Sequence, residues 1–373
     1  MKSINELKNL SGKKVIVRVD FNVPIKDGKV LDDFRIKKTI PTILYLQKNG
    51  AKIIMISHIG ENEKESLLPV EKIINKYIKN FSFIKTSIFS NETEKKINEM
   101  KKGEVFLLEN LRAETGEVKN SPSFARALSR YGEIYINEAF SVSHREHASI
   151  VGVTKYLPGY AGLQFISEVE NLTKIFNPKH PFLFILGGAK FETKIPLIKK
   201  YLRMADNIFI GGAIANDFFK NRGYEIGESL VGPNNFQIPL LMKSKNLILP
   251  VDVKVIKKTK SRFVNPTDVL IDEKIVDIGP KSISNLKDLL SKAEFVLWNG
   301  PLGEYENGFG GATEEVLKLI AKSKAYSVIG GGDTVSLITK LKIENKLGFV
   351  STGGGATLDF LSKGTLPGIR VLK

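Results

Sequence analysis

The sequence predicts an α/β protein built from two doubly wound parallel-sheet domains of the Rossmann-like kind. Three observations predict this fold. Short, continuously apolar runs recur along the chain with helical stretches between them, which is typical of parallel strands buried on both faces. Half of these runs in the second half end in glycine. The 373 residues are also too many for a single ordinary core.

Four apolar runs in the first half are expected to be strands: residues 15–19, 53–56, 105–108 and 134–136. Helical stretches at 36–48 and 123–131 separate them. Ser3 and Glu6 have the spacing of a capping box and predict a short initial helix. Residues 157–162 interrupt the pattern, and a helix-like stretch then continues to residue 176. The domain boundary is therefore expected in this region.

Six runs in the second half are expected to be strands: residues 182–186, 208–210, 247–249, 295–298, 328–329 and 349–350. Each ends in glycine, or in proline or asparagine, followed by polar residues. Ligands of parallel sheets bind outside the carboxyl ends of the strands, where glycine lets backbone N–H groups approach an anion and the next helix adds its positive end. The pattern predicts a phosphate-binding rim.

Composition narrows the class of protein. The chain has no cysteine, which excludes disulfides and thiolate chemistry, and no apolar run reaches the ~18 residues that span a bilayer. No signal-like segment opens the chain, so a cytoplasmic protein without a membrane partner is expected. The formal charge of +16 admits nucleic-acid binding. Because the lysines are scattered without a dense block or interleaved aromatics, we expect no nucleic-acid partner.

In the first half, arginine and histidine recur at the ends of the expected strands. Arg35, His58, Arg112 and Arg145 are the main examples. Guanidinium groups bind phosphate and carboxylate in a fork geometry, so several of them facing one crevice suit a small phosphorylated anion. Single arginines of this kind are as often surface ion pairs. The pair of histidines three residues apart before Ser149 favours hydrogen bonding over a metal site, because no third ligand has a suitable spacing.

The second half has neither a Walker-type phosphate loop nor a G-x-G-x-x-G fingerprint. Lys190 and Lys194 follow two glycines across a turn into a helix, where both can reach phosphates. Asp333 follows three glycines at a strand end, a position suited to a Mg²⁺ ion that bridges phosphates. Its alternative role is a helix N-cap, with Thr334 as a second candidate cap. Glu306 is expected to accept ribose hydroxyls.

Taken together, these motifs resemble the phosphoglycerate kinase family over essentially the whole chain and in the family's order. They lie at residues 18–24, 57–60, 108–112, 144–149, 187–194, 277–280, 298–301, 330–334, 351–356 and 366–369. The resemblance implies a monomeric, hinge-bending enzyme that transfers a phosphoryl group reversibly between 1,3-bisphosphoglycerate and ADP, giving 3-phosphoglycerate and ATP with Mg²⁺. It also implies a phosphoglycerate-binding domain at 1–160, joined by a returning tail at about 358–373, and a nucleotide-binding domain at 161–357.

The resemblance assigns roles position by position. The phosphoglycerate site would comprise Asp20, Asn22, Arg35, His58, Ile59, Gly60, Glu61, Arg112 and Arg145. The nucleotide site would comprise Lys190, Lys194, Gly212, Asn299, Glu306, Gly331, Gly332, Asp333 and Thr334, with Asp333 toward the metal. Arg35, Lys190 and Gly354 would act on the moving phosphoryl group. An ionised carboxylate needs no general base, so the absence of a catalytic dyad is no objection.

The sequence departs from the family at three places. Glu61 stands where an arginine is common, so a raised KM for 3-phosphoglycerate is expected unless Lys64 compensates. The usual Asp-Ala-Phe-Gly is Glu138-Ala139-Phe140-Ser141, and Ala213 replaces a frequent glycine on the adenine side. Two other hypotheses stay open on sequence alone: a nucleotide-binding relative that has lost catalysis, and a nucleic-acid-binding protein.

Overall fold

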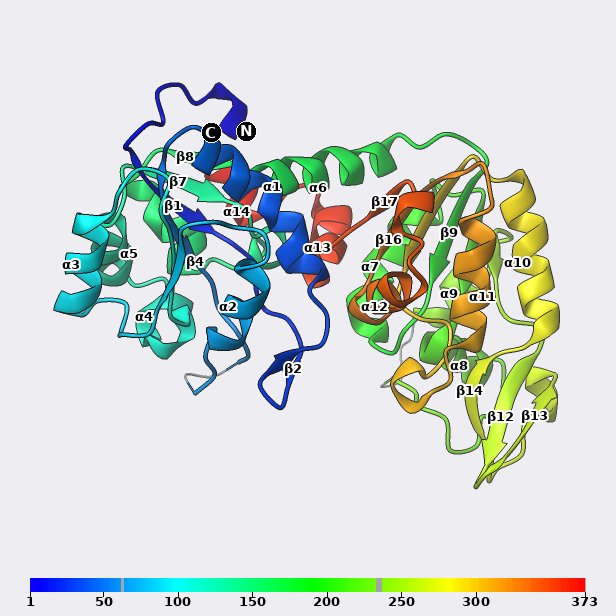
Figure 1. The fold of residues 1–373 in the computed structure, drawn as a ribbon. Helices are drawn as coiled ribbons and strands as arrows, with labels where there is room; N and C mark the ends of the chain where they lie inside the picture. Colours follow the sequence, from blue (N-terminus) through cyan, green and yellow to red (C-terminus); the bar gives the residue numbers. More distant parts are fainter. Residues whose placement is uncertain (62–63, 233–236, 373) are drawn as a thin grey trace. The chain divides into compact units, whose positions relative to one another are not determined.

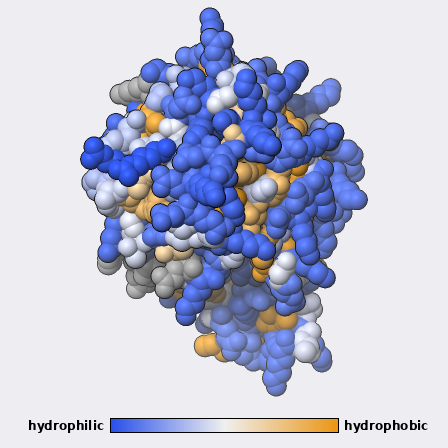
Figure 2. Space-filling view, turned by 60° about the vertical axis from the view of Figure 1, so that its left-hand side comes forward, coloured by the Kyte–Doolittle hydropathy of each residue, from blue (hydrophilic) through white to orange (hydrophobic). Residues whose placement is uncertain are grey.

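The computed structural model describes residues 1–61, 64–232 and 237–372. The chain divides into two compact units (Figure 1). The first comprises Met1–Glu170 and Lys363–Lys373, and the second comprises Asn171–Ser362. In the part of the chain that is described, no helix combines the length and the apolar character needed to cross a bilayer. On the face drawn in Figure 2, hydrophilic residues predominate and apolar ones are scattered among them.

The first unit contains a six-stranded parallel sheet in the order β5-β6-β4-β1-β7-β8. Four of its strands are the predicted ones: β1 (Lys14–Arg18), β4 (Lys52–Ile56), β6 (Val105–Leu108) and β7 (Ile134–Asn137). The strand order reverses at β1, whose neighbours are β4 on one side and β7 on the other. In open α/β sheets such a reversal opens a crevice at the carboxyl ends, and the polar motifs at residues 18–24, 57–60 and 137–147 all start there.

Helices complete this unit. They are α1 (Phe34–Lys48), α2 (Leu68–Ile74), α3 (Asn91–Glu99), α4 (Thr115–Val118), α5 (Pro122–Ser129) and α14 (Pro367–Arg370). A short ribbon of β2 (Ile25–Lys26) and β3 (Lys29–Val30) precedes α1. The capping box is confirmed: the Ser3 side chain and the Glu6 carboxylate close a 3-10 turn over Ile4–Glu6.

The end of the chain returns to the first unit. The Lys2 N–H donates to the Leu372 carbonyl at 2.9 Å, and the Gly368 N–H donates to the Ser143 carbonyl at 2.9 Å. Figure 1 accordingly draws both termini on the same unit. The tail is therefore an integral part of the first unit.

The second unit contains a parallel sheet in the order β11-β10-β9-β15-β16-β17. All six strands were predicted: β9 (Phe182–Leu186), β10 (Asn207–Ile210), β11 (Leu247–Ile248), β15 (Phe295–Asn299), β16 (Tyr326–Gly330) and β17 (Phe349–Val350). Here the order reverses between β9 and β15, which pair directly. The glycines at 187–188 and 300 follow these two strands, so this sheet also places its glycine-rich turns at the reversal.

The helices of this unit are α7 (Phe191–Tyr201), α8 (Gly212–Asn221), α9 (Ile238–Leu241), α10 (Pro280–Lys292), α11 (Gly311–Ile320), α12 (Gly332–Leu341) and α13 (Gly355–Lys363). Three further strands form a small antiparallel sheet: β12 (Val253–Lys257), β13 (Lys260–Val264) and β14 (Lys274–Ile278). The purely parallel prediction missed this sheet, because its strands are charged and β13 is almost fully exposed, so no apolar run marks them.

Two strands of the first unit were also missed. The segment that was expected only to interrupt the pattern contains β8 (Gly159–Ala161), which pairs with β7 in parallel. It has three residues and a glycine, so it carries no strand signal of its own. β5 (Phe81–Ile84) pairs with β6 at the opposite edge; it has only four residues, and Ser82 interrupts its apolar ones. Both strands are too short to be identified from their composition alone.

Helix α6 (Leu163–Thr173) runs from the first unit into the second and begins over a buried carboxylate. Glu138 accepts hydrogen bonds from the Gln164 and Phe165 N–H groups at 3.0 and 3.1 Å, and from the Thr42 hydroxyl. Burial raises the pKa of Glu138 to about 7. The first departure from the family's Asp-Ala-Phe-Gly motif thus caps this helix.

Candidate active site

The carboxyl edge of the first sheet holds an arginine in a fixed orientation. Arg35 is the second residue of α1, and its Nη1 lies 3.0 Å from Asp20 Oδ2 and 3.1 Å from the Asn22 carbonyl. Asp20 is buried, and the Ser141 hydroxyl donates to the same carboxylate oxygen, so the serine of the altered family motif helps to orient this group. The Arg35 side chain remains 29 % exposed and can present its other N–H groups to a ligand.

The loop after β4 is hydrogen-bonded to Asn22, whose carbonyl also contacts Arg35. The Gly60 N–H donates to Asn22 Oδ1 at 3.0 Å, and Arg112 donates to the Gly60 carbonyl. Gly60 has a φ of +65°, a conformation that glycine adopts without strain. Ile59 is held from the other side, where its N–H donates to Asn110 Oδ1 at 3.1 Å. Residues 59–60 are therefore held by groups that follow the ends of β1 and β6.

His58 is buried in this loop, and its Nδ1 lies 3.0 Å from Arg18 Nη2. Burial and the positive charges of Arg18, Arg112 and Arg145 hold the pKa of His58 far below its usual range, so the imidazole is neutral. A guanidinium only donates, which makes Nδ1 the acceptor and places the single proton on Nε2. His58 therefore offers one N–H donor to an anion and has no proton to gain at physiological pH.

Cations crowd together around His58. Arg112 is partly buried, and its pKa is lowered by burial and by the charges of Arg145 and Arg18. Arg145 is exposed, with its Nε 3.4 Å from His144 Nε2. Holding like charges together is unfavourable unless an anion joins them, so the arginines near His58 suit an anion. Arg35 is linked to Arg112 through Asn22 and Gly60.

Arg18 is the buried arginine that contacts His58 within this cluster. Its side chain is 1 % exposed and donates to Ser149 Oγ at 2.9 Å and to the Val19 carbonyl. Ser149 in turn donates to Glu117 through its hydroxyl at 2.6 Å and through its N–H at 2.9 Å. Sequence reasoning placed Arg18 in a motif but did not identify Glu117. A glutamate in an unremarkable helical stretch carries no local signal that it will be fully buried beside an arginine 99 positions away in the chain.

The two histidines near this cluster do not share a helix. His144 lies in a turn, and His147 immediately precedes the short helix at Ala148–Gly152. His147 Nδ1 is 3.8 Å from Glu117 Oε1, and burial lowers the pKa of His147 to about 4. The spacing of the two histidines would allow a common helix face, but the chain turns between them. Among the described residues, no three His, Asp or Glu side chains form a metal cluster.

Glu61 is exposed at the edge of the anion site, where its charge acts on Arg112. We expect Glu61→Arg to lower the KM for 3-phosphoglycerate by about 3- to 10-fold with little change in kcat, because one repulsive charge is replaced by an attractive one at an exposed position. Steady-state kinetics at low salt and at 0.3 M salt would measure the change in KM. The change should be smaller at 0.3 M salt, because the salt screens the charge at this exposed position. An unchanged KM at low salt would contradict a cost at this position. Asn62, which completes the departure, lies outside the described residues.

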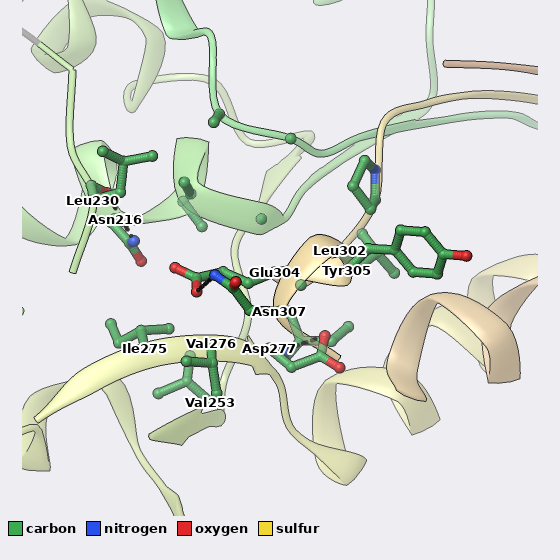
Figure 3. Close-up of a pocket in the computed structure, with 18 of the residues that line it drawn as sticks. Asn216, Leu230, Val253, Ile275, Val276, Asp277, Leu302, Glu304, Tyr305 and Asn307 are labelled. Carbon is green, nitrogen blue, oxygen red and sulfur yellow. Dashed lines mark hydrogen bonds between the residues drawn. The ribbon is translucent and has the colours of Figure 1, made fainter. Parts of the chain in front are cut away.

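The second unit contains a pocket with a volume of about 320 Å³ at the carboxyl edge of its sheet (Figure 3). One part of its lining consists of glycine turns, including Gly188 and Gly212, together with Asp333. Gly212 has a φ of +60°, and a Cβ there would lie 2.5 Å from the Gly188 nitrogen. The two backbones therefore approach each other as only glycine allows. Ala213, the third departure from the family, also lines the pocket.

Lys194 lies beneath these turns. It is 6 % exposed and donates to the Gly187 carbonyl, and a Cβ on Gly188 or Gly300 would lie within 3 Å of its Nζ. Burial lowers the pKa of Lys194 to about 8, and the charge of Asp333 opposes part of that shift. Lys190 is exposed at the residue before α7. The two lysines therefore differ: one ammonium is buried under the glycines and the other stands at the rim.

The lowered pKa of Lys194 predicts proton uptake on nucleotide binding. At pH 8.5 most of this lysine is neutral in the free protein, and the negative charge of a bound diphosphate raises its pKa, so the complex takes up a fraction of a proton and affinity falls above pH 8. Calorimetry at pH 8.5 in two buffers of different ionisation enthalpy would measure the uptake. Lys194→Met should abolish it, and a wild-type uptake of zero would contradict the assignment.

Asp333 and Thr334 are the second and third residues of α12, and neither side chain caps the helix. Thr334 Oγ1 is buried without a hydrogen-bond partner among the described residues. Asp333 is half-buried; burial and Glu306 raise its pKa, whereas Lys194 lowers it. The alternative role of helix N-cap is therefore not realised by either residue. A single carboxylate beside an unpaired hydroxyl fits Mg²⁺ bound together with phosphates, which needs few protein ligands.

The remaining predicted nucleotide residues also lie at this edge. Asn299 is buried at the end of β15, and Gly331, with a φ of +105°, precedes α12, whose first residue is Gly332. Glu306 is exposed on the pocket wall, in the short 3-10 helix after β15. Gly354, with a φ of +52°, directly precedes α13. The second unit thus brings glycine turns, the acids Glu306 and Asp333 and the buried Lys194 to the carboxyl edge of its sheet.

The fold and the two sites define a class of protein: an α/β phosphotransferase with an anion site at one sheet edge and a nucleotide-sized pocket at another. The phosphoglycerate kinase family model matches residues 4–364. The chain is 39 % identical to the phosphoglycerate kinase of Dictyoglomus turgidum, over 100 % of this chain and 99 % of that one. It is 38 % identical to that of Leptospira biflexa, over 98 % and 97 %.

Solved structures agree with the sequence comparisons. The phosphoglycerate kinase of Pyrococcus horikoshii matches with a TM-score of 0.88 at 30 % identity, covering 100 % of this chain and 98 % of that one. The enzyme from Coxiella burnetii matches with a TM-score of 0.81 at 34 % identity, covering 99 % and 98 %. The chain belongs to the phosphoglycerate kinase family.

Proposed function

We propose that this enzyme transfers a phosphoryl group reversibly between 1,3-bisphosphoglycerate and ADP, giving 3-phosphoglycerate and ATP in glycolysis. The observation that carries the proposal is the presence, in a chain of this family, of an anion site at the strand reversal of one sheet and a nucleotide-sized pocket at that of the other. The first site takes phosphoglycerate and the second takes the nucleotide. In domain terms, residues 1–160 with the tail from about 358 hold phosphoglycerate, and residues 161–357 hold the nucleotide.

In the first unit, the chemistry is one of orientation and charge. Arg35, held by Asp20 and Asn22, faces the anion with its remaining N–H groups. His58 donates from Nε2, while Arg112 and Arg145 neutralise the substrate's phosphate. The attacking carboxylate is already ionised, so no residue has to remove a proton, and the neutral His58 is consistent with that requirement.

In the second unit, Lys194 and the glycine turns position the phosphates, and Glu306 accepts from the ribose. Bound Mg²⁺ neutralises charge on the phosphates, and Asp333 is the residue that would hold it, with Thr334 beside it. Lys190 and backbone N–H groups near Gly354 meet charge on the transferred group. Because Arg35 and Lys190 belong to different units, the proposed mechanism includes a closing motion that joins them and excludes water.

The proposal also covers the oligomeric state, the cellular location and the partners of the enzyme. We expect a monomer in the cytoplasm whose partners are small molecules, without nucleic acid. The scattered lysines support the last point, because a dedicated reading surface would concentrate them.

A coupled assay tests the function directly. ATP consumption would be followed with 3-phosphoglycerate and Mg²⁺, with each component omitted in turn as a control. We expect turnover that requires all three. Nucleotide binding by calorimetry without any turnover would instead support the impaired-relative hypothesis. A salt-sensitive gel shift with duplex or single-stranded DNA at physiological salt would support the nucleic-acid hypothesis, and we expect none.

A further inference from the structure

The nucleotide pocket contains a polar side chain for which the proposed function has not yet assigned a role. Asn216 lies on α8, four residues and about one helical turn beyond Gly212, and both residues line the pocket. Figure 3 shows Asn216 beside Leu230, with Ile275 and Val276 on the facing wall. The helix thus leads from the glycine turns, which suit phosphates, to an apolar region of the pocket that suits the flat faces of a base.

Asn216 is 2 % exposed, and its amide orientation is determined by its neighbour. Its Nδ2 donates to the Leu230 carbonyl at 3.0 Å. A carbonyl can only accept, so the NH₂ group must face Leu230 and Oδ1 must face away from it. Oδ1 is buried and has no hydrogen-bond partner among the described residues. A buried acceptor of this kind is unfavourable unless something else donates to it.

The other acceptor on this part of the wall is already engaged. Glu304 lies 2.6 Å from the ammonium of Lys274 and accepts from Asn307 Nδ2 at 3.1 Å, as Figure 3 shows for the second contact. Its charge is therefore balanced within the protein. Asn216 Oδ1 is the acceptor that calls for a donor from the ligand.

We infer that Asn216 selects the base: its Oδ1 accepts a hydrogen bond from the 6-amino group of a purine and thereby favours adenine nucleotides. The phosphates lie at the glycine turns and the ribose at Glu306, so the edge of the base remote from the sugar meets Asn216. Adenine carries an NH₂ donor on that edge, whereas a 6-oxopurine carries an acceptor at the same place and would face Oδ1 with like polarity. The inference rests on the proposed function of the pocket as the nucleotide site.

Binding of three nucleotides to the intact protein tests this inference. Dissociation constants would be measured by calorimetry with Mg²⁺ for ADP, for purine riboside 5′-diphosphate, which lacks only the 6-amino group, and for inosine 5′-diphosphate. We expect ADP to bind about 10-fold more tightly than either analogue, the effect of one buried hydrogen bond whose acceptor is otherwise left unpaired. Equal affinity for ADP and purine riboside diphosphate would overturn the inference.

Variants separate base selection from a structural role. The nearly isosteric Asn216→Leu change should reduce the ratio of the analogue's dissociation constant to that of ADP to about 1. It should do so mainly by weakening the binding of ADP. Asp217→Asn is the matched control, because Asp217 neighbours Asn216 without lining the pocket and accepts from the Gly232 N–H at 2.8 Å. That control should keep the wild-type ratio. If the Asn216→Leu protein keeps the wild-type ratio of dissociation constants, the inference is overturned. If this variant does not fold, the comparison of the three nucleotides on the wild-type protein decides.

The two proposals fail in different ways. If ADP binds preferentially but ATP is not consumed with 3-phosphoglycerate, the proposed reaction fails and the base selection stands. If turnover occurs but the three nucleotides bind equally, the reaction stands and the role of Asn216 is overturned.

Discussion

Lys190→Ala is expected to lower kcat by about 100- to 1,000-fold, the range seen when one preorganised group that meets transition-state charge is removed. Lys190 stands exposed at the residue before α7, next to pocket-lining Ala189, whereas Lys194 is buried beneath the glycine turns. Because Lys190 is proposed to act on the transferred phosphoryl group, the loss should appear in kcat rather than in ADP binding. Coupled kinetics and ADP calorimetry on the same preparation would separate the two effects.

Lys199→Ala is the matched control, because this lysine is also exposed and lies in the last turn of the same helix. It removes the same charge from the same element, so it should change kcat by less than about 2-fold. A Lys190→Ala enzyme within about 3-fold of wild type would reject Lys190 as a group that acts on the transferred phosphoryl.

Arg18→Met should lower the free energy of unfolding of the first unit by about 3–5 kcal/mol, the usual cost of removing one member of a buried charged pair. The substitution keeps most of the volume but leaves the buried Glu117 carboxylate without the opposing charge that now lowers its pKa. It also removes the donors to Ser149 and to the Val19 carbonyl. Urea denaturation followed by hydrogen exchange in β1, β4 and β7 would measure the loss in this unit.

A double-mutant cycle assigns the cause of that loss. Because Glu117→Gln removes the carboxylate charge, the Arg18→Met and Glu117→Gln changes together should cost less than the sum of the two single changes by at least about 1 kcal/mol. Additive losses would mean that Arg18 acts through packing alone. A stability within 1 kcal/mol of wild type for Arg18→Met would contradict the electrostatic account of this core.

The sequence predicted those elements of the fold that their own composition identifies, and these make up most of it. All six strands of the second parallel sheet are continuous apolar runs, since both faces of such strands are buried. β8 is the counterexample: it has three residues, one of them glycine, and it is a strand only because β7 supplies its partner. The antiparallel sheet β12–β14 was missed because charged residues interrupt the apolar positions of β12 and β14 and because β13 is almost fully exposed.

The site residues also fall into two groups, those that local motifs predict and those that only tertiary contacts identify. The order of motifs predicts glycine-rich turns, lysines and arginines at strand ends, and the structure places them at the carboxyl edges of the two parallel sheets. The structure rules out the alternative capping role of Asp333 and Thr334, which residue type alone left open because capping depends on local geometry. Asn216 was not identified at all. A polar residue among the apolar residues of a helix was the signal available, but many such residues are simply satisfied inside a core.

By itself, the sequence determined the α/β class, the two parallel sheets, the family and the residue types at the strand ends, because these depend on periodicity and on motifs local in the chain. Only the tertiary structure decided the electrostatics. It brought Glu117 to Ser149 beside Arg18, placed Lys194 under the glycine turns and turned the oxygen of Asn216 away from Leu230. Burial, partner and orientation are properties of residues distant in the chain that meet in space, so they decide which ionisable groups are shifted and which polar atoms remain open to a ligand.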